Sequence, residues 1–166
     1  GHSGNGQIAR NAFQLDTAWP EAMVVYPNGI PGIEGDRDPK GLRPGWQKDP
    51  GQLGDRDLKF FDAMLEDLSG KYKIDQSRVY ACGFSNGGRM TYLLWSQRRD
   101  KLAAVAAFSS QATSGDLYQS FKPLPALVAS GMKDTRVTPD IAKLSFSQVL
   151  AQNLGDKSKG KTAKGV

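Results

Sequence analysis

Ser85 lies in a G-x-S-x-G pattern at residues 83–87, the part of the sequence that points most directly to chemistry. A serine hydroxyl becomes a nucleophile when a base removes its proton, and an acid must orient that base. Residues 78–82 predict a buried strand, and residues 86–98 carry apolar side chains at helical spacing. A strand, a tight glycine-flanked turn and a helix favour a nucleophile elbow over an ordinary turn with a solvent-facing serine.

Asp134 is the candidate for the acid. It follows an apolar run at residues 125–131, and parallel sheets place their functional loops at the carboxyl ends of the strands. An acid that follows the serine along the chain also fits the order found in α/β-hydrolase triads. The alternatives are that Asp134 only caps a turn, or that Asp140 is the acid, although Pro139 indicates the start of a helix there.

The stabilisation of an oxyanion needs two backbone N–H groups directed at the developing charge. We expect one from Asn86 and the other from His2, with Ser3 as the next candidate, because residues 1–6 are rich in glycine. The competing interpretation is that residues 1–6 are a flexible terminal loop. His2 is also the only histidine, and it lies at the wrong end of the chain for the order serine, acid, histidine. These residues therefore do not supply their own base.

Several elements must position these groups. Apolar runs predict strands at residues 22–26, 102–108 and 125–131, in addition to the one before Ser85. Helices are expected from a cap at Asp55 to about Ser69, ended by Gly70, and over residues 139–153. Residues 27–54 form a long loop and residues 109–122 a polar connection. The alternation predicts one α/β domain over residues 1–166, with a mainly parallel sheet.

Composition bounds the class of protein. With 39% hydrophobic and 23% charged residues, the chain can build a real core, and no apolar run approaches the length of a membrane span, about 20 residues. The net charge of +5 is mild and its lysines and arginines are scattered, apart from a lysine-rich tail after residue 156. This pattern disfavours nucleic acid as a partner. Cys82, the only cysteine, cannot close an intrachain disulfide and is expected in the core.

The combined motifs resemble the secreted serine esterases grouped as polyhydroxybutyrate depolymerases, feruloyl esterases and acetyl xylan esterases of carbohydrate esterase family one. The segments that carry this resemblance are GHSGNG (1–6), VVYPNG (24–29), RPGWQ (43–47), GDRDLKFFD (54–62), DQSRVY (75–80), GFSNGG (83–88) and GMKD (131–134). The resemblance implies a three-layer α/β-hydrolase sandwich, truncated at both ends, with the catalytic histidine beyond Val166. The 166 residues alone are then expected to be inactive.

The resemblance further implies an extracellular hydrolase acting on polyester, feruloyl or acetyl esters, without a metal or organic cofactor. Ser85 would form the acyl-enzyme and Asp134 would orient the absent histidine. Trp46, in the long loop, would either line the substrate pocket or anchor the loop on the core. Two other classes stay open: a serine peptidase of the prolyl-oligopeptidase type, and an inactive hydrolase-like module that binds a polymer.

Overall fold

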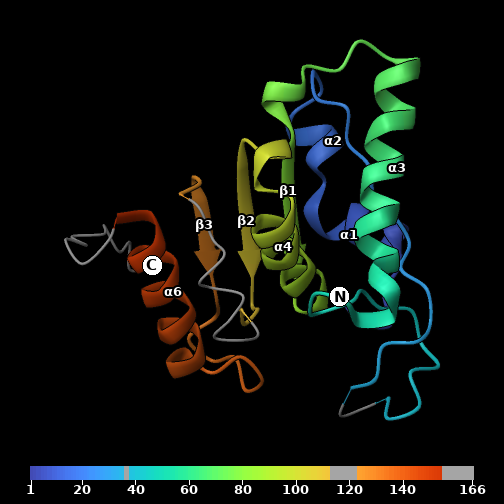
Figure 1. Cartoon of the computed structure of the whole chain (residues 1–166). Coiled ribbons are helices and arrows are strands. Elements are labelled where there is room, and N and C mark those ends of the chain that lie inside the picture. Colours follow the sequence, from blue (N-terminus) through green and yellow to red (C-terminus); the bar gives the residue numbers. More distant parts are fainter. Residues whose placement is uncertain (36–37, 113–122, 155–166) are drawn as a thin grey trace.

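The computed structural model describes residues 1–35, 38–112 and 123–154, and its centre is a parallel three-stranded sheet (Figure 1). The strands are β1 (Tyr80–Phe84), β2 (Ala104–Phe108) and β3 (Ala126–Ala129), adjacent in that order. Phe84 pairs with Phe108, which pairs with Ala129. Because the strands are parallel and in this register, their carboxyl ends meet at one edge of the sheet, where the predicted site residues follow them.

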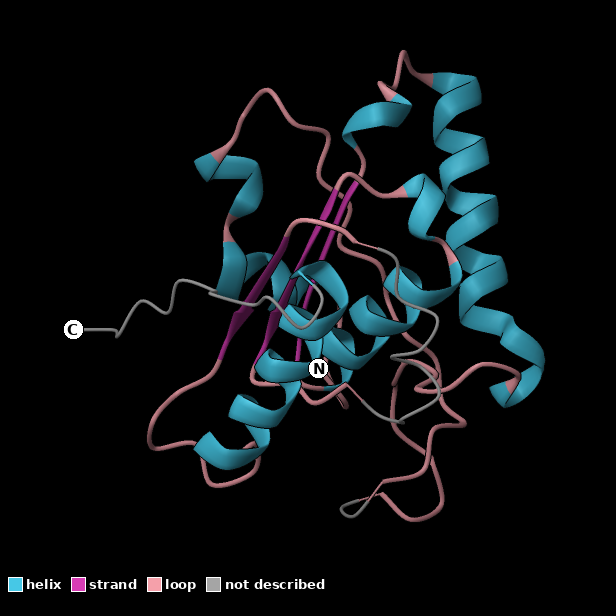
Figure 2. Cartoon of the chain, turned by 60° about the vertical axis from the view of Figure 1, so that its left-hand side comes forward, coloured by secondary structure: helices cyan, strands magenta, loops and turns pink. Residues whose placement is uncertain are grey.

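Helices lie on both sides of the strands (Figure 2). The α-helices are α1 (Gly6–Phe13), α2 (Leu15–Ala18), α3 (Arg56–Lys71), α4 (Asn86–Gln97) and α6 (Pro139–Leu154). Short 3₁₀ turns at η1 (Gln52–Asp55), η2 (Gln76–Arg78) and η3 (Arg99–Lys101) connect several of these elements. From residue 56 onward, the described elements follow the order α3, β1, α4, β2, β3 and α6, as the predicted strands and helices do.

The two faces of the sheet are covered by different helices. On one face, Val105 and Ala107 are buried in the core cluster formed with α3, α4 and α6. On the other face, the ring of Phe108 contacts that of Phe13 in α1, with 5.6 Å between the ring centroids. Since successive side chains of a strand point to opposite faces, α1 and α4 lie on opposite sides of the sheet. The three-layer arrangement predicted from the sequence is confirmed.

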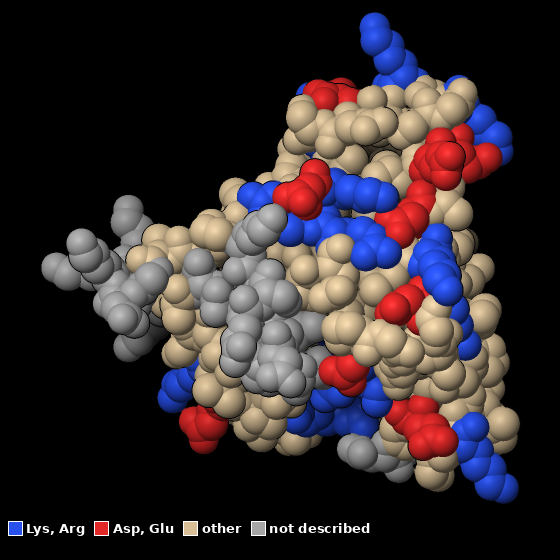
Figure 3. Space-filling view, viewed as in Figure 1, with Lys and Arg blue, Asp and Glu red and all other residues tan. Residues whose placement is uncertain are grey.

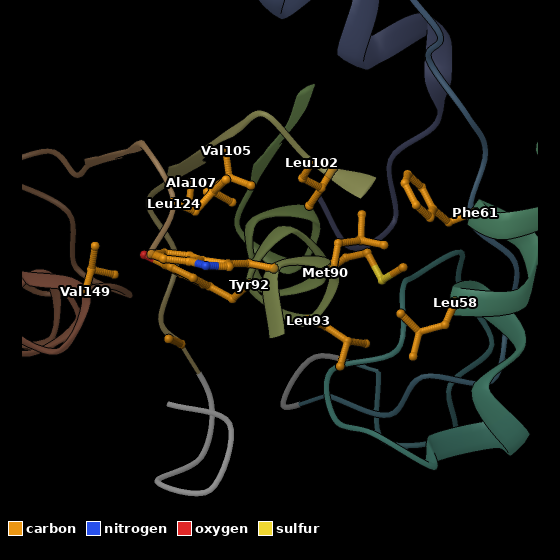
Figure 4. Close-up of a cluster of buried hydrophobic side chains, with 13 residues drawn as sticks. Leu58, Phe61, Met90, Tyr92, Leu93, Leu102, Val105, Ala107, Leu124 and Val149 are labelled. Atoms are coloured by element: carbon orange, nitrogen blue, oxygen red, sulfur yellow. The ribbon is translucent and has the colours of Figure 1, made fainter. Parts of the chain in front are cut away.

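Helix α4 is the centre of the core. Tyr92, Leu93 and Trp95 are 1%, 0% and 0% exposed, so the helix is covered on all sides, as a helix that is apolar around its circumference should be. Leu58 of α3 packs at one end of the cluster and Val149 of α6 at the other (Figure 4). The helix that begins next to Ser85 is therefore packed against α3, α6 and the sheet.

Two expectations about strands are wrong. Residues 23–29 belong to no helix or strand, although they include most of the predicted strand 22–26, and Met23 and Val25 are 48% and 43% exposed. Strand propensity reports how a side chain fits a pleated surface, whereas a strand also needs a backbone partner, and no described strand pairs with this segment. Cys82 is exposed, because its face of the sheet is uncovered at that position.

The boundaries of α3 also differ from the prediction. The helix runs through Gly70 to Lys71, because a glycine in a helix interior costs only about 1 kcal/mol and the packed apolar face outweighs that cost. Asp55 precedes the helix but makes no side-chain capping bond. Gln47, from the long loop, replaces it: its side-chain oxygen accepts from the N–H groups of Asp57 and Leu58 at 2.9 and 3.3 Å.

Replacement of Gln47 by leucine is expected to destabilise the protein by about 3 kcal/mol, because the N–H groups of Asp57 and Leu58 would lose their acceptor in a buried environment. The Gln47 side chain is fully buried and also donates to Asp55 and to the carbonyl of Asp49. Chemical denaturation measures the free energy of unfolding. The matched control is Gln52→Leu, which removes an acceptor for the N–H of Lys48 at a half-buried position; equal losses for the two variants would contradict the prediction.

Part of the predicted organisation lies outside the described residues, namely most of the polar connection 109–122 and the lysine-rich tail. On the face shown in Figure 3, basic and acidic side chains are interspersed. Within the described ranges, no helix has the length and apolar character needed to cross a membrane.

Candidate active site

Ser85 occupies a strained turn between β1 and α4. Its φ and ψ are 55° and −117°, a combination that L-residues rarely adopt and that persists only where the surroundings enforce it. The Ser85 N–H donates to the carbonyl of Phe108 at 2.9 Å, which ties the turn to β2. The sharp reversal brings β1 against the first turn of α4: a Cβ on Gly83 would lie 2.2 Å from the carbonyl oxygen of Gly87. This is the geometry of a nucleophile elbow.

Residues 1–5 pass directly beside Ser85. A Cβ on Gly1 would lie 3.6 Å from the Cβ of Ser85 and 3.5 Å from the carbonyl oxygen of Phe84. The segment then turns, with the Gly4 N–H donating to the Gly1 carbonyl at 3.0 Å, and enters α1 through Asn5, whose side chain accepts from Ile8 N–H. The predicted loop for the second oxyanion donor is therefore a folded turn against the elbow.

His2 is held by an acidic side chain that the sequence did not single out. Its Nε2 lies 3.0 Å from Oδ2 of Asp38, and Asp38 is 6% exposed. A Cβ on Gly45 would lie 2.8 Å from His2 Nδ1, so the ring also packs on the long loop. The side chain of His2 thus has a structural partner, and its backbone N–H remains the candidate oxyanion donor.

Asp134 follows β3 at the same edge of the sheet as Ser85. Its Oδ1 accepts from the N–H groups of Arg136 and Val137 at 2.9 and 3.0 Å. These bonds, helped by Ser109, hold the pKa of Asp134 below its ordinary value, so the carboxylate is charged at neutral pH. The turn-cap role is therefore present, and the role as triad acid stays a prediction. Asp140 is on the exposed side of α6, with its side chain 92% exposed and 3.7 Å from Lys143.

Trp46 is positioned by contacts within the protein. Its ring stacks on that of Phe60, with 6.2 Å between centroids, and packs against the core cluster. Its backbone N–H and carbonyl both bond to the side chain of Asn86, at 2.7 and 2.8 Å. These contacts match the loop-anchor interpretation, and a contact of Trp46 with substrate stays a prediction.

A cavity of about 490 Å³ opens at the carboxyl edge of the sheet, between α1 and the strands. It is lined mainly by apolar side chains, including Ile8, Phe13, Phe84 and Phe108. Gly1 also lines it and connects it to the elbow. An apolar cavity beside a candidate nucleophile is a candidate binding site for the hydrophobic part of a substrate.

Sequence reasoning missed three side chains that contact the candidate site residues. Asp38 stood in a loop with no periodicity, so nothing marked it as buried. The sequence singled out Asn86 for its backbone N–H only, whereas its carboxamide anchors the loop at Trp46. Ser109, which has a φ of 41° and helps to lower the pKa of Asp134, directly follows its strand as Ser85 does, and this parallel in position was visible in the sequence.

Stability is expected to fall in acid because several aspartates are charged through specific bonds. The side chain of Arg98 lowers the pKa of Asp62, and backbone N–H groups lower that of Asp134, both from the ordinary value of 3.8. A carboxylate with a lowered pKa in the folded state stabilises the protein above its unfolded pKa, and this stabilisation is lost as the pH falls below that value. The urea concentration at the midpoint of unfolding should therefore fall as the pH is lowered from 5 to 3. The fall should be smaller in the Asp62→Asn variant than in the wild-type protein. An unchanged midpoint across this range would refute the expectation.

The fold is that of the α/β-hydrolase esterases. Esterase PE8 matches with a TM-score of 0.70 and 20% identity, over 93% of this chain and 76% of that chain. Arabidopsis thaliana SOBER1 matches with a TM-score of 0.70 and 18% identity, over 92% and 80%. At these identities the likeness concerns the fold, which the elbow and the three layers had already indicated.

The sequence itself is similar to proteins named as feruloyl esterases and as an acetylxylan esterase. Feruloyl esterase D of Neurospora crassa is 39% identical over 46% of this chain. "Probable feruloyl esterase C" of Aspergillus terreus is 33% identical over 72%, and a bifunctional acetylxylan esterase/xylanase of Neocallimastix patriciarum 30% over 75%. The resemblance to this esterase group is confirmed. The chain spans 25%, 42% and 17% of these relatives' lengths, and no family model matches it.

Proposed function

We propose that the protein is a carboxylic-ester hydrolase that works through an acyl-enzyme on Ser85. The observation that carries this proposal is the strained elbow with residues 1–5 folded against it. A Cβ built on Gly1 would lie 3.6 Å from the Cβ of Ser85. A backbone conformation with φ 55° and ψ −117° at a serine is energetically costly, and strain of this kind is found mostly at functional sites. The esterase names of the sequence relatives favour the same activity.

In the proposed reaction, the Ser85 oxygen attacks the ester carbonyl carbon and its proton passes to a histidine that lies outside these 166 residues. The N–H groups of Asn86 and His2 stabilise the oxyanion. The histidine then protonates the leaving alcohol, and water releases the acid by the same steps. Asp134, charged at neutral pH, orients the histidine. No metal or organic cofactor takes part in this scheme.

The substrates we propose are feruloyl or acetyl esters of plant polysaccharide, because the relatives carry those names. The apolar cavity beside Gly1 would accept the acyl group. Hydroxyalkanoate polyesters are the further candidate from the resemblance of the motifs. Action on an extracellular polymer requires a secreted enzyme, and we propose that location with the substrate.

The test uses the full-length protein with p-nitrophenyl acetate, methyl ferulate and a chromogenic prolyl peptide amide. Ester turnover is expected, together with mass-spectrometric detection of a fluorophosphonate adduct on the peptide that contains Ser85. Cleavage of the amide with a catalytic efficiency equal to that for the esters would favour the peptidase. Binding of xylan or polyester without turnover or labelling would favour the inactive module.

A further inference from the structure

Residues 43–46 lie between the two backbone segments that would supply the oxyanion donors; we name this segment the brace. On the side of residues 1–5, the carbonyl of Pro44 accepts from the Ser3 N–H at 2.8 Å. Gly45 is buried, and a Cβ at this position would lie 2.8 Å from Nδ1 of His2. Backbone of the brace is therefore packed directly against the residue whose N–H is the candidate donor.

On the other side, the brace is joined to the residue that follows the nucleophile. The N–H of Trp46 donates to Oδ1 of Asn86 at 2.7 Å, and Nδ2 of Asn86 donates to the Trp46 carbonyl at 2.8 Å. Asn86 is 7% exposed. A buried carboxamide that bonds to both the N–H and the carbonyl of one residue fixes the orientation of residue 86, including its own N–H.

Asp38 closes the arrangement at the far end of the brace. Its carboxylate accepts from the N–H groups of Leu42 and Arg43 at 2.9 and 2.8 Å and lies 3.0 Å from His2 Nε2. One buried side chain therefore holds the start of the brace and the ring of His2 together. Burial alone would raise the pKa of Asp38, but these donors hold it below its ordinary value.

We propose that the brace sets the separation between the N–H groups of His2 and Asn86, and that the Asn86 carboxamide and the Asp38 carboxylate are positioning residues of the reaction. The inference rests on the proposed ester hydrolysis. Donors stabilise an oxyanion only when they lie about 2.7–3.1 Å from the oxygen that becomes charged. Removal of either the Asn86 or the Asp38 contacts would displace one N–H donor relative to the other. The transition state would then be stabilised less, whereas substrate binding would be unchanged.

Asn86→Ala tests this, because it removes both bonds to Trp46 and keeps the N–H of residue 86. We expect kcat for p-nitrophenyl acetate to fall by roughly 10- to 100-fold, somewhat less than for loss of a whole donor, with KM within about threefold. The affinity for a trifluoromethyl ketone, whose adduct with Ser85 carries an oxyanion, should fall by the same factor. The affinity for the acid product should stay unchanged.

The matched control is Phe60→Leu, which removes the ring that stacks on Trp46 but no hydrogen bond of the brace. It should lower the melting temperature and leave kcat and inhibitor affinity unchanged. Asp38→Asn, which keeps the shape of the side chain but replaces one acceptor by a donor, should lower kcat and inhibitor affinity together, and it decides the matter if Asn86→Ala does not fold.

The outcomes separate the two proposals. An active wild-type protein whose folded Asn86→Ala variant keeps its kcat and its trifluoromethyl ketone affinity would overturn the brace inference alone. A fall in kcat for Phe60→Leu equal to that for Asn86→Ala would also overturn it, since general loosening would then be the cause. A wild-type protein without esterase turnover, or without an adduct on Ser85, would overturn the proposed function instead.

Discussion

Ser85→Ala is expected to lower kcat/KM for ester hydrolysis by about 10⁴-fold or more, because loss of the nucleophile leaves only the oxyanion donors and binding to accelerate the reaction. The rate that remains should no longer show an acyl-enzyme burst. Stopped-flow measurement with p-nitrophenyl acetate in the full-length protein gives both quantities. Ser96→Ala is the control: that hydroxyl bonds to the Leu93 carbonyl within α4, away from the turn, and its loss should leave kcat/KM unchanged.

Ser85→Gly separates catalysis from strain at the same position. Glycine accepts a positive φ without a steric penalty, so this variant should be as inactive as Ser85→Ala and more stable than it by about 1–2 kcal/mol. Retention of most of the activity in either variant would exclude Ser85 as the nucleophile. Equal stability of the two variants would exclude strain at this residue.

Gly83→Ala is expected to destabilise the protein by about 4 kcal/mol or more, which is the range of the most severe single substitutions. The added Cβ would lie 2.2 Å from the carbonyl oxygen of Gly87, 2.3 Å from its carbon and 2.8 Å from the nitrogen of Gly88. All three are backbone atoms, so no side chain can rotate away to relieve the contact. Only a separation of β1 from the start of α4 can do so, and that movement would also displace Ser85.

Gly70→Ala is the matched control for Gly83→Ala. Gly70 lies near the end of α3, and apart from its chain neighbours and the backbone of its own helix no atom lies within 4 Å of a Cβ built on it. The substitution should stabilise the protein by about 0.5–1 kcal/mol through helix propensity. The free energy of unfolding from guanidinium titration measures both variants. A cost below about 1 kcal/mol for Gly83→Ala would mean that the elbow adjusts far more easily than its backbone contacts indicate.

The sequence predicted the parts of this molecule whose cause is local. The elbow could be predicted because glycine, serine and the flanking apolar patterns are all within 20 residues of one another. Helix α6 and strands β2 and β3 were predicted within a few residues for the same reason. The location of Ser85 and Asp134 at the same edge of the sheet could be predicted because the strands before them were expected to be parallel.

The parts that could not be predicted depend on partners far away in the sequence. Gln47 caps α3 from across a loop, whereas the residue next to the helix, Asp55, was the natural prediction. Asp38 binds a ring 36 residues away, and no periodicity marks such a pair. Residues 22–26 have the composition of a strand, but a strand forms only where its backbone can hydrogen-bond to an adjacent strand.

Helix α4 is buried, whereas residues 1–5 beside Ser85 are partly exposed, so the two parts are expected to differ in their free energy of local opening. The side chains in the middle of α4 are almost fully enclosed, so we expect its amide hydrogens to exchange with solvent only when the whole domain opens. Gly1, Ser3 and Asn5 are exposed, and their segment is held by a few individual contacts: the bond of Ser3 to the Pro44 carbonyl, the turn closed by Gly4, the cap of α1 and the contact of His2 with Asp38. The segment that we propose for the second oxyanion donor is therefore expected to open in local fluctuations, while the turn at Ser85 stays held between β2 and α4.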